Sequence, residues 1–370
     1  MLKTKQSREA ALAALFEPTG YGRADPALLQ PADSFLELSG EDIRRRLFLT
    51  YDGTGREYCL RPEFTIPVAR AYLADMPKAM PANYWYCGPV FRHRPQGSGE
   101  FLQGGIESLG RTDRAAADAE TLDIALQACR ALGVAAPQIA LGDVGLLDAV
   151  LAGLKLPADT MRRLRRRLAG GQPPAALLDA PEGDTASSLG GYAGLLTALE
   201  GVDKQQAQAF VADVLSIAGL QNVGGRSVSD IAERFLAKAG QNGAALSGEN
   251  AALIGDFLAL SGHPDEVSAK ARRLSQDAGL AIDAALDEFD TRTGFMAARG
   301  IDIEALKVAT AFTRNMDYYT GFVFEMTAPG QPATLIAGGR YDNLLTRLGA
   351  REPVPAVGCA IWVERFGETA

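Results

Sequence analysis

The residues best suited to binding a small molecule lie in residues 84–109, YWYCGPVFRHRPQGSGEFLQGGIESL. Both ends of this segment are rich in aromatic and branched residues, and residues 94–100 are polar, Pro and Gly. The pattern predicts two antiparallel strands joined by a loop. On the second strand, alternation places Gln103, Gly105 and Glu107 on one face. At roughly 3.3 Å per residue, Gln103 and Glu107 lie about 13 Å apart at the backbone. That face suits a small molecule with two polar ends, although a solvated strand face has the same pattern.

Two other segments combine charged residues with glycines and aromatics in strand-like surroundings. They are residues 61–65, RPEFT, and residues 314–325 together with 338–342, GGRYD. A buried charge is unfavourable unless it is paired, so charged residues on strands need either each other or a ligand. Structural salt bridges would account for any one of these segments. Together with residues 92–107 they make three such segments, and the coincidence favours a shared site.

The composition excludes several classes of protein. The chain has 37 Lys and Arg against 45 Asp and Glu, a net charge of -8 and a pI of about 5.1, which argues against a large nucleic-acid footprint. It has no phosphate-loop, H-E-x-x-H or G-x-S-x-G motif. We expect neither a disulfide framework nor a metal site, because the cysteines form no C-x-x-C pair and only two histidines exist. These residues are Cys59, Cys87, Cys129, Cys359, His93 and His263.

The elements that must position the candidate residues are strands and helices in mixed order. Alternation and turn residues predict hairpins over 47–64 and 84–109 and strands over 317–326, 334–336 and 356–362. Apolar periodicity predicts helices over 7–16, from Pro67 onward and over 112–132, and a turn at 338–342 that leads into another helix.

The amino-acid composition changes in the middle of the chain. Residues 142–300 are rich in Ala and Leu and are divided by Gly and Pro into helix-length pieces, which predicts a mainly helical insertion between two parts of a core, 1–141 and 301–370. Within it, Arg162–Arg167 has the appearance of a nucleic-acid patch, but a solvated or partner-facing helix side fits an acidic protein better. Residues 1–20 contain no apolar run long enough for a signal or a membrane span, so a cytoplasmic location is predicted.

The order of motifs resembles the catalytic domain of histidyl-tRNA synthetase, a class II synthetase. The motifs are LRPEFT, YCGPVFRHRPQ with FLQGGIE, RNMDYYTGFVFE, GGRYDNLL and PAVGCAIWVERF, and they span nearly the whole chain. The resemblance implies an α+β fold, with a six-stranded antiparallel sheet flanked by helices, a helical insertion and a dimer. An anticodon-binding domain is not expected, because the chain ends five residues after Arg365.

Seven residues match the positions that hold histidine in that family. The resemblance implies one group around the α-amino group, an arginine near the carboxylate, and a third group at the imidazole. These are Glu63, Thr65 and Gln103 for the amino group, Arg314 for the carboxylate, and Glu107, Tyr319 and Tyr341 for the imidazole. The residue types suit these roles, because a carboxylate accepts from an imidazole N–H and a guanidinium binds a carboxylate through two bonds. Phe64 replaces the usual glycine of the first motif and could narrow the amino-group side.

The ATP site of the family is altered in this chain. The loop Gln96–Glu100 is short and has no Lys or Arg, so a phosphate there would meet Glu100 in place of a cation. Trp362 stands where the family has a glycine, and its indole is expected to fill part of the nucleotide space. Arg92 and Arg365 are kept and form a remnant nucleotide site. Synthetase activity is therefore not expected.

A synthetase-like body with a histidine pocket and an altered ATP site is similar to the regulatory subunit family of ATP phosphoribosyltransferase. This resemblance implies a non-catalytic protein that dimerises, binds the short-form catalytic subunit in a hetero-octamer at the first step of histidine biosynthesis, and mediates activation and feedback by histidine. It implies no catalytic residue, cofactor, nucleic acid or membrane. One alternative is a trimmed adenylating ligase that activates histidine or another amino acid for a non-tRNA acceptor. Another is a scaffold whose pocket is a relic.

Overall fold

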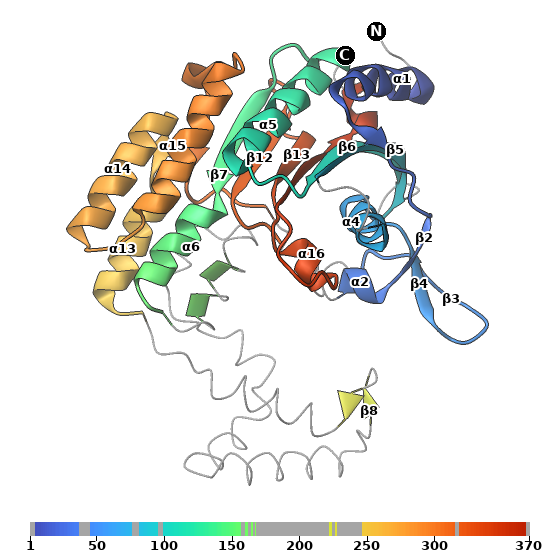
Figure 1. Cartoon of the computed structure of the whole chain (residues 1–370), viewed down its shortest axis with the longest axis horizontal. Coiled ribbons are helices and arrows are strands. Elements are labelled where there is room, and N and C mark those ends of the chain that lie inside the picture. Colours follow the sequence, from blue (N-terminus) through green and yellow to red (C-terminus); the bar gives the residue numbers. More distant parts are fainter. Residues whose placement is uncertain are drawn as a thin grey trace. The chain divides into compact units, whose positions relative to one another are not determined.

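The structure is a computed structural model, and it describes most of the chain outside residues 168–221 and 228–245 (Figure 1). The described residues are 4–36, 45–75, 81–94, 99–156, 160–161, 164–165, 167, 222–223, 226–227, 246–314 and 318–367. Residues 96–98 of the hairpin loop and residues 162, 163 and 166 of the arginine-rich stretch lie outside them. No helix in the described ranges is long and apolar enough to cross a membrane.

The chain divides into two compact units. The first contains residues 1–155, 168–171 and 256–370, and the second contains 156–167 and 172–255. In the second unit the structure describes a small antiparallel pair, β8 (Asn222–Val223) with β9 (Arg226–Ser227). The bounds predicted from composition for the insertion, 142 and 300, differ from the bounds of this unit.

The first unit is built on a nine-stranded sheet in the order β1-β5-β6-β14-β13-β12-β7-β11-β10, counted over the described residues. Every neighbouring pair from β5 to β7 is antiparallel, which confirms the expected six-stranded antiparallel sheet. Two pairs near the edges, β1 with β5 and β11 with β7, are parallel. The strands are β1 (Gly22–Arg23), β5 (Ala82–Phe91), β6 (Glu100–Leu109), β7 (Gln138–Asp143), β10 (Ser261–Gly262), β11 (Lys307–Ala309), β12 (Phe322–Thr327), β13 (Thr334–Arg340) and β14 (Ala356–Trp362).

Helices cover the sheet. On one face, α5 packs on β13 and β14, and α1 and α15 pack on α5 (Figure 1). Helix α4 packs on β6, and α16 packs on α4. These helices are α1 (Lys5–Phe16), α4 (Thr65–Ala74), α5 (Arg114–Ala131), α15 (Asp283–Ala298) and α16 (Leu344–Arg347); the others described are α2 (Asp33–Leu36), α6 (Val144–Gly153), α13 (Gly248–Leu258) and α14 (Pro264–Asp277), with the short 3-10 helices η1 (Glu17–Thr19), η3 (Ile303–Ala305) and η4 (Val363–Gly367).

A second, three-stranded sheet lies beside α4, in the order β2-β4-β3. Its strands are β2 (Leu29–Pro31), β3 (Leu49–Tyr51) and β4 (Glu57–Leu60), and β3 and β4 pair antiparallel across the turn at residues 52–55. The turn is closed by Asp52, whose carboxylate accepts from the backbone N–H groups of Thr54 and Arg56 at 2.8 and 3.0 Å. The predicted hairpin over residues 47–64 is confirmed.

The prediction of a turn at residues 338–342 is wrong in its first half. Gly338, Gly339 and Arg340 are the last residues of β13, and they pair with Cys359, Gly358 and Val357 of β14. A Cβ on Gly338 would lie 2.3 Å from the carbonyl oxygen of Gly358, so glycine here permits close strand approach. The glycine pair therefore marks two closely packed strands.

Arg340 and Asp342 belong to a buried network of ion pairs. Arg340 binds Asp118 of α5 at 2.7 Å and Asp342 at 2.8 Å, and Asp118 also lies 3.4 Å from Arg292 of α15. Arg340 and Asp118 are at most 1% exposed. Burial alone would favour the neutral form of Asp118, and the two guanidinium groups oppose it. These charges satisfy each other and join α5, α15 and β13, so they are not available to a ligand.

Candidate functional site

A cavity of about 90 Å³ lies over the centre of the large sheet. Its floor comes from β6, β13 and β14, and its rim from the start of α4 and from the segment before β12. The lining residues are Glu63, Thr65, Arg92, Gln103, Glu107, Arg314, Tyr318, Tyr319, Ala337, Tyr341, Gly358, Cys359, Ala360 and Trp362. All seven predicted histidine-binding residues are among them, although they come from four separate parts of the sequence.

The strand register explains why Gln103 and Glu107 reach the same cavity. On β6 they are four residues apart, and β14 places Trp362 opposite Gln103 and Gly358 opposite Glu107. Directly opposed residues on neighbouring strands point to the same face of the sheet. The polar face predicted on the second hairpin strand is therefore confirmed as a cavity wall.

Gly358 makes room for the Glu107 carboxylate. A Cβ on Gly358 would lie only 1.9 Å from Glu107 Oε2. Gly105, between Gln103 and Glu107, makes room for Tyr86, since a Cβ there would lie 2.4 Å from the Tyr86 hydroxyl. The glycine predicted as the floor of the pocket is thus covered by an aromatic ring.

Glu107 accepts hydrogen bonds from three hydroxyl groups. Thr65 and Tyr86 donate to Oε1 at 2.7 and 3.2 Å, and Tyr341 donates to Oε2. A carboxylate has about four acceptor positions, so roughly one is left on Oε2 for a ligand donor such as an N–H. Burial raises the pKa of Glu107 to about 8, and the hydroxyls of Tyr341 and Thr65 oppose this rise. A cationic or N–H-donating ligand would favour the charged carboxylate.

The carboxylate of Glu63 accepts hydrogen bonds from the first residues of α4. Its two carboxylate oxygens accept from the backbone N–H groups of Thr65 at 2.6 Å and Ile66 at 3.0 Å, which are among the first donors of the helix. Burial raises the pKa of Glu63, while these N–H groups and Arg92 oppose the rise. Glu63 lines the cavity and at the same time fixes Thr65 so that its hydroxyl reaches Glu107.

Two polar atoms of the cavity lack a partner among the described residues. Gln103 is 1% exposed, and its Oε1 accepts no hydrogen bond. The Nε of Arg314 is also buried without an acceptor, although Arg314 pairs with Glu325 through Nη1. An unpaired buried acceptor and donor are unfavourable, so the two atoms suit water or a ligand that carries both a donor and an acceptor.

The predicted narrowing of the cavity by Phe64 is not what the structure shows. Phe64 is 1% exposed and stacks on Tyr86 with 4.3 Å between ring centroids, within a cluster that includes Val68, Val90 and Phe101. It is not one of the lining residues. The ring fills core volume beneath the site, because Gly88 of β5 leaves space for it.

The two residues of the predicted remnant nucleotide site, Arg92 and Arg365, lie in different places relative to the cavity. Arg92 lines the cavity, and its Nε donates to the carbonyl of Pro62 at 2.7 Å. Trp362 also lines the cavity, and the Arg365 guanidinium lies 5.0 Å from its ring centroid. Arg365 itself is not a lining residue and donates to the carbonyl of Thr334. The indole of Trp362 therefore lies at the cavity, and Arg365 packs against that ring without lining the cavity.

Several lining residues were not singled out from the sequence. They are Tyr318, Ala337, Gly358, Cys359 and Ala360. Gly358 and Ala360 could have been found from the register of β14 against β6, once the pairing of Gly358 with Glu107 is known. The ring centroid of Tyr318 lies 4.9 Å from that of Tyr319. The only feature of the sequence that pointed to Tyr318 is the pair of tyrosines in DYYTG.

The fold is that of histidyl-tRNA synthetases. The family profile of histidyl-tRNA synthetase matches residues 2–209 and 207–366 of the chain. A solved structure described as an ATP phosphoribosyltransferase regulatory subunit/histidyl-tRNA synthetase from Bacillus halodurans C is similar with a TM-score of 0.69 and 22% identity, covering 99% of this chain and 79% of that one. Histidyl-tRNA synthetase from Nostoc sp. PCC 7120 gives a TM-score of 0.65 at 18% identity, covering 98% and 70%.

The sequence is also similar, over nearly its full length, to proteins of one kind within this class. The ATP phosphoribosyltransferase regulatory subunit of Mesorhizobium japonicum is 40% identical over 97% of both chains. That of Sinorhizobium fredii is 38% identical, covering 96% of this chain and 94% of the relative. The chain belongs to the family of ATP phosphoribosyltransferase regulatory subunits.

Proposed function

We propose that this chain is the non-catalytic, histidine-sensing regulatory subunit of ATP phosphoribosyltransferase. In this role it binds and activates a short-form catalytic subunit in a hetero-octamer, and histidine in its cavity feeds back on the first step of histidine biosynthesis. The family membership supports the regulatory role. The observation that carries the choice of ligand is the incomplete polar lining of the cavity, with Gln103 Oε1 and Arg314 Nε buried and unpaired among the described residues. We also propose a cytoplasmic location.

The chemistry of histidine complements this lining. Its α-ammonium group supplies the donor for Gln103 Oε1, its carboxylate supplies an acceptor for Arg314, and its imidazole N–H supplies a donor for the free position on Glu107 Oε2. Each ligand group then satisfies a group that is buried in the cavity. Thr65 and Tyr341 hold Glu107 in place, with Thr65 at 2.7 Å, so histidine would find the carboxylate already oriented.

The size of the cavity supports a small amino acid over an aminoacyl-adenylate. A volume of about 90 Å³ lies well below the roughly 300 to 1,000 Å³ of sites for drug-sized ligands, and so favours the smaller ligand. The indole of Trp362 lies against the cavity, and Arg365 is turned to Thr334. The adenylating ligase, the alternative function, would need Arg365 and the space of Trp362 for its nucleotide.

Calorimetry with the purified chain tests the choice of ligand. We expect saturable binding of histidine, weaker binding of histidinol, which lacks the carboxylate that Arg314 would bind, and no binding of ATP at the same cavity. An absence of heat with millimolar histidine would leave only a scaffold role. Robust ATP–pyrophosphate exchange with histidine would instead establish the ligase.

A further inference from the structure

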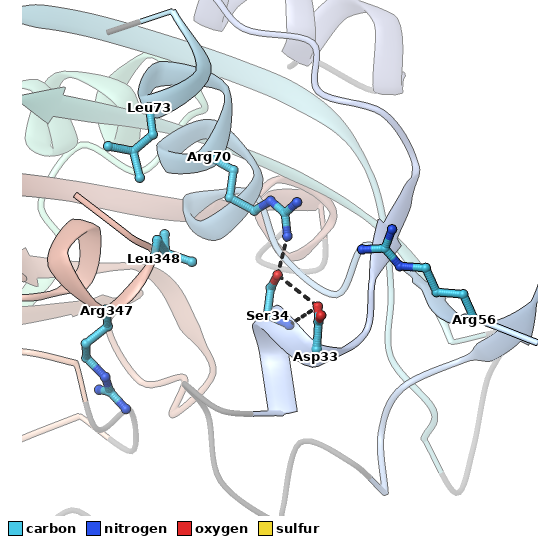
Figure 2. Close-up of a pocket in the computed structure, with 7 residues that line it drawn as sticks. All are labelled: Asp33, Ser34, Arg56, Arg70, Leu73, Arg347 and Leu348. Atoms are coloured by element: carbon cyan, nitrogen blue, oxygen red, sulfur yellow. Dashed lines mark hydrogen bonds between the residues drawn. The ribbon is translucent and has the colours of Figure 1, made fainter. Parts of the chain in front are cut away.

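A second cavity, separate from the one on the sheet, lies between α2, α4, α16 and the β3–β4 hairpin (Figure 2). It has a volume of about 350 Å³. We call it the arginine pocket; its lining residues are Asp33, Ser34, Arg56, Arg70, Leu73, Arg347 and Leu348. It shares no lining residue with the proposed histidine site.

The charge of this pocket is opposite to that of the protein. Its lining carries three arginines and one aspartate, whereas the chain as a whole has a net charge of -8. The arginines come from three separate elements: Arg56 precedes β4, Arg70 lies on α4 and Arg347 ends α16. Three guanidinium groups around one hollow in an acidic protein produce a local positive potential that attracts anions.

The printed contacts of Arg56 and Arg70 leave much of the charge of these two side chains available. Arg70 donates through Nη1 to the hydroxyl of Ser34 (Figure 2). Asp33 accepts from the backbone N–H of Ser34 at 2.7 Å and from its hydroxyl at 3.2 Å. Arg56 lies 5.5 Å from the ring centroid of Tyr58. In the described part of the chain, neither Arg56 nor Arg70 forms an ion pair with a carboxylate.

The geometry of the walls indicates the kind of anion. In Figure 2, Arg70 lies between a side that carries Ser34 and Arg56 and a side that carries Leu73 and Leu348. A guanidinium presents five donors in a planar fork that matches the oxygens of a phosphate, and Arg70 uses one of them on Ser34. The leucines offer an apolar surface for the part of a ligand that carries no charge. The volume lies within the usual range of about 300 to 1,000 Å³ for small-molecule sites.

We propose that the arginine pocket binds a small phosphorylated molecule, with its phosphate at Arg56 and Arg70 and its sugar or base against Leu73 and Leu348. Arg347 adds a third cation at the rim. The ligand class is a nucleotide or a sugar phosphate. This inference is independent of the proposed histidine sensing, since the two cavities have no residue in common.

Titration of the purified full chain with inorganic pyrophosphate, AMP and ribose 5-phosphate tests the inference, at near-physiological salt and without metal. We expect saturable binding of AMP or ribose 5-phosphate, tighter than that of pyrophosphate, and unchanged when the chain is saturated with histidine. Binding of AMP alone identifies the nucleotide, and binding of ribose 5-phosphate alone identifies the sugar phosphate. Binding of none, or of pyrophosphate only, would overturn the proposal, as would displacement by histidine.

Variants locate the binding. Arg70→Gln and Arg347→Gln should each weaken it about tenfold, the effect of losing one charge-assisted hydrogen bond. Arg273→Gln, an exposed arginine of α14, is the matched control and should bind as the wild type does. Thermal unfolding checks that each variant is folded. If Arg70→Gln does not fold, Arg347→Gln is used alone, because Arg347 is exposed. Equal loss in the Arg273 variant, or a change in self-association by sedimentation without a change in anion affinity, would contradict a phosphate site.

Discussion

Glu107 is the residue on which the proposed histidine site depends most. It is 1% exposed and its carboxylate already accepts from Thr65, Tyr86 and Tyr341. We expect Glu107→Ala to weaken histidine binding by about 1.5 to 3 kcal/mol, the range for a hydrogen bond to a charged group. Glu107→Gln, which keeps an acceptor, should show a smaller loss.

Calorimetry with histidine measures this change. Glu352→Ala, which removes an exposed carboxylate elsewhere, is the matched control and should bind histidine as the wild type does. Equal affinity in the Glu107 and Glu352 variants would mean that the imidazole end of the ligand is wrongly assigned.

The pKa of Glu107 makes the stability of the ligand-free protein depend on pH. Burial raises this pKa from the ordinary value of 4.5 to about 8, so between these values the folded state holds a proton that the unfolded chain releases. The stabilisation by the protonated carboxyl is therefore complete below about pH 4.5 and is lost as the pH rises toward 8. The raised pKa of Glu63 acts in the same direction.

Urea unfolding at a series of pH values measures this dependence. Without histidine, the free energy of unfolding of the wild type should fall relative to that of Glu107→Gln by about 1 to 3 kcal/mol between pH 5 and 8. Saturating histidine should make the pH dependence of the unfolding free energy more similar in the wild type and in Glu107→Gln, because a bound N–H donor favours the charged carboxylate. Parallel profiles for the two proteins without ligand would show that Glu107 is ionised throughout this range.

At the residue scale, the sequence predicted which side chains meet in the cavity but not what each contacts. Glu63, Thr65 and Gln103 were assigned together to the amino group, yet Thr65 donates to Glu107 and Glu63 accepts from the start of α4. Such partners depend on rotamers and on which backbone donors a helix leaves free, and neither follows from residue type alone.

At the scale of elements, the glycines of β14 and β6 determine the shape of the site. Because a Cβ on Gly358 would lie 1.9 Å from Glu107 Oε2 and 2.4 Å from the carbonyl of Ile106, alanine there must displace β14 or Glu107. We expect Gly358→Ala to abolish histidine binding and to lower the free energy of unfolding by about 1 to 3 kcal/mol, as overpacking does.

Denaturant unfolding and calorimetry on the same variant check both effects. Gly294→Ala is the control, because a Cβ at this position of α15 meets no atom within 4 Å. Alanine in a helix interior should raise the unfolding free energy by about 0.5 to 1 kcal/mol and leave binding unchanged. Retention of full histidine affinity by Gly358→Ala would show that the cavity does not hold the ligand.

The ion pairs between α5, α15 and β13 are expected to stabilise the fold without any part in binding. Arg340 binds both Asp118 and Asp342, and all three are buried. Arg340→Met should lower the free energy of unfolding by about 3 to 5 kcal/mol, because it leaves carboxylates buried without a partner. Arg272→Met is the matched comparison: it removes three ion pairs of a partly exposed arginine with exposed carboxylates and should change stability little. Similar losses in the two variants would contradict this contrast.

Most elements of the sheet unit could be predicted from the sequence. The hairpins, α1, α5 and the last strand follow from local periodicity and turn residues, which act over a few positions. The strand β7 and the extension of β13 through Gly338–Arg340 could not be found, because they depend on pairing with strands distant in the chain. The helical insertion at 142–300 stays a prediction from composition, and the second compact unit covers 156–167 and 172–255.

At the scale of the whole molecule, the proposed regulation requires that the cavity and the partner interface favour different states of the assembly. Allosteric coupling typically amounts to about 1 to 3 kcal/mol, and it is reciprocal. We therefore expect the catalytic subunit to change the affinity of this chain for histidine by roughly 5- to 150-fold. Calorimetric titration of histidine into the isolated chain and into the complex measures this ratio, and identical affinities would exclude coupling.

Reconstitution with a short-form ATP phosphoribosyltransferase subunit tests the central proposal most directly. The two chains are mixed, isolated together by size exclusion, and assayed for phosphoribosyl transfer with and without histidine, with Glu107→Ala in parallel. We predict co-elution, activity that the catalytic subunit lacks alone, inhibition by histidine, and loss of that inhibition but not of activation in the Glu107 variant. Failure of the chains to associate, or inhibition by histidine that is equal in wild type and variant, would contradict a histidine sensor in this cavity.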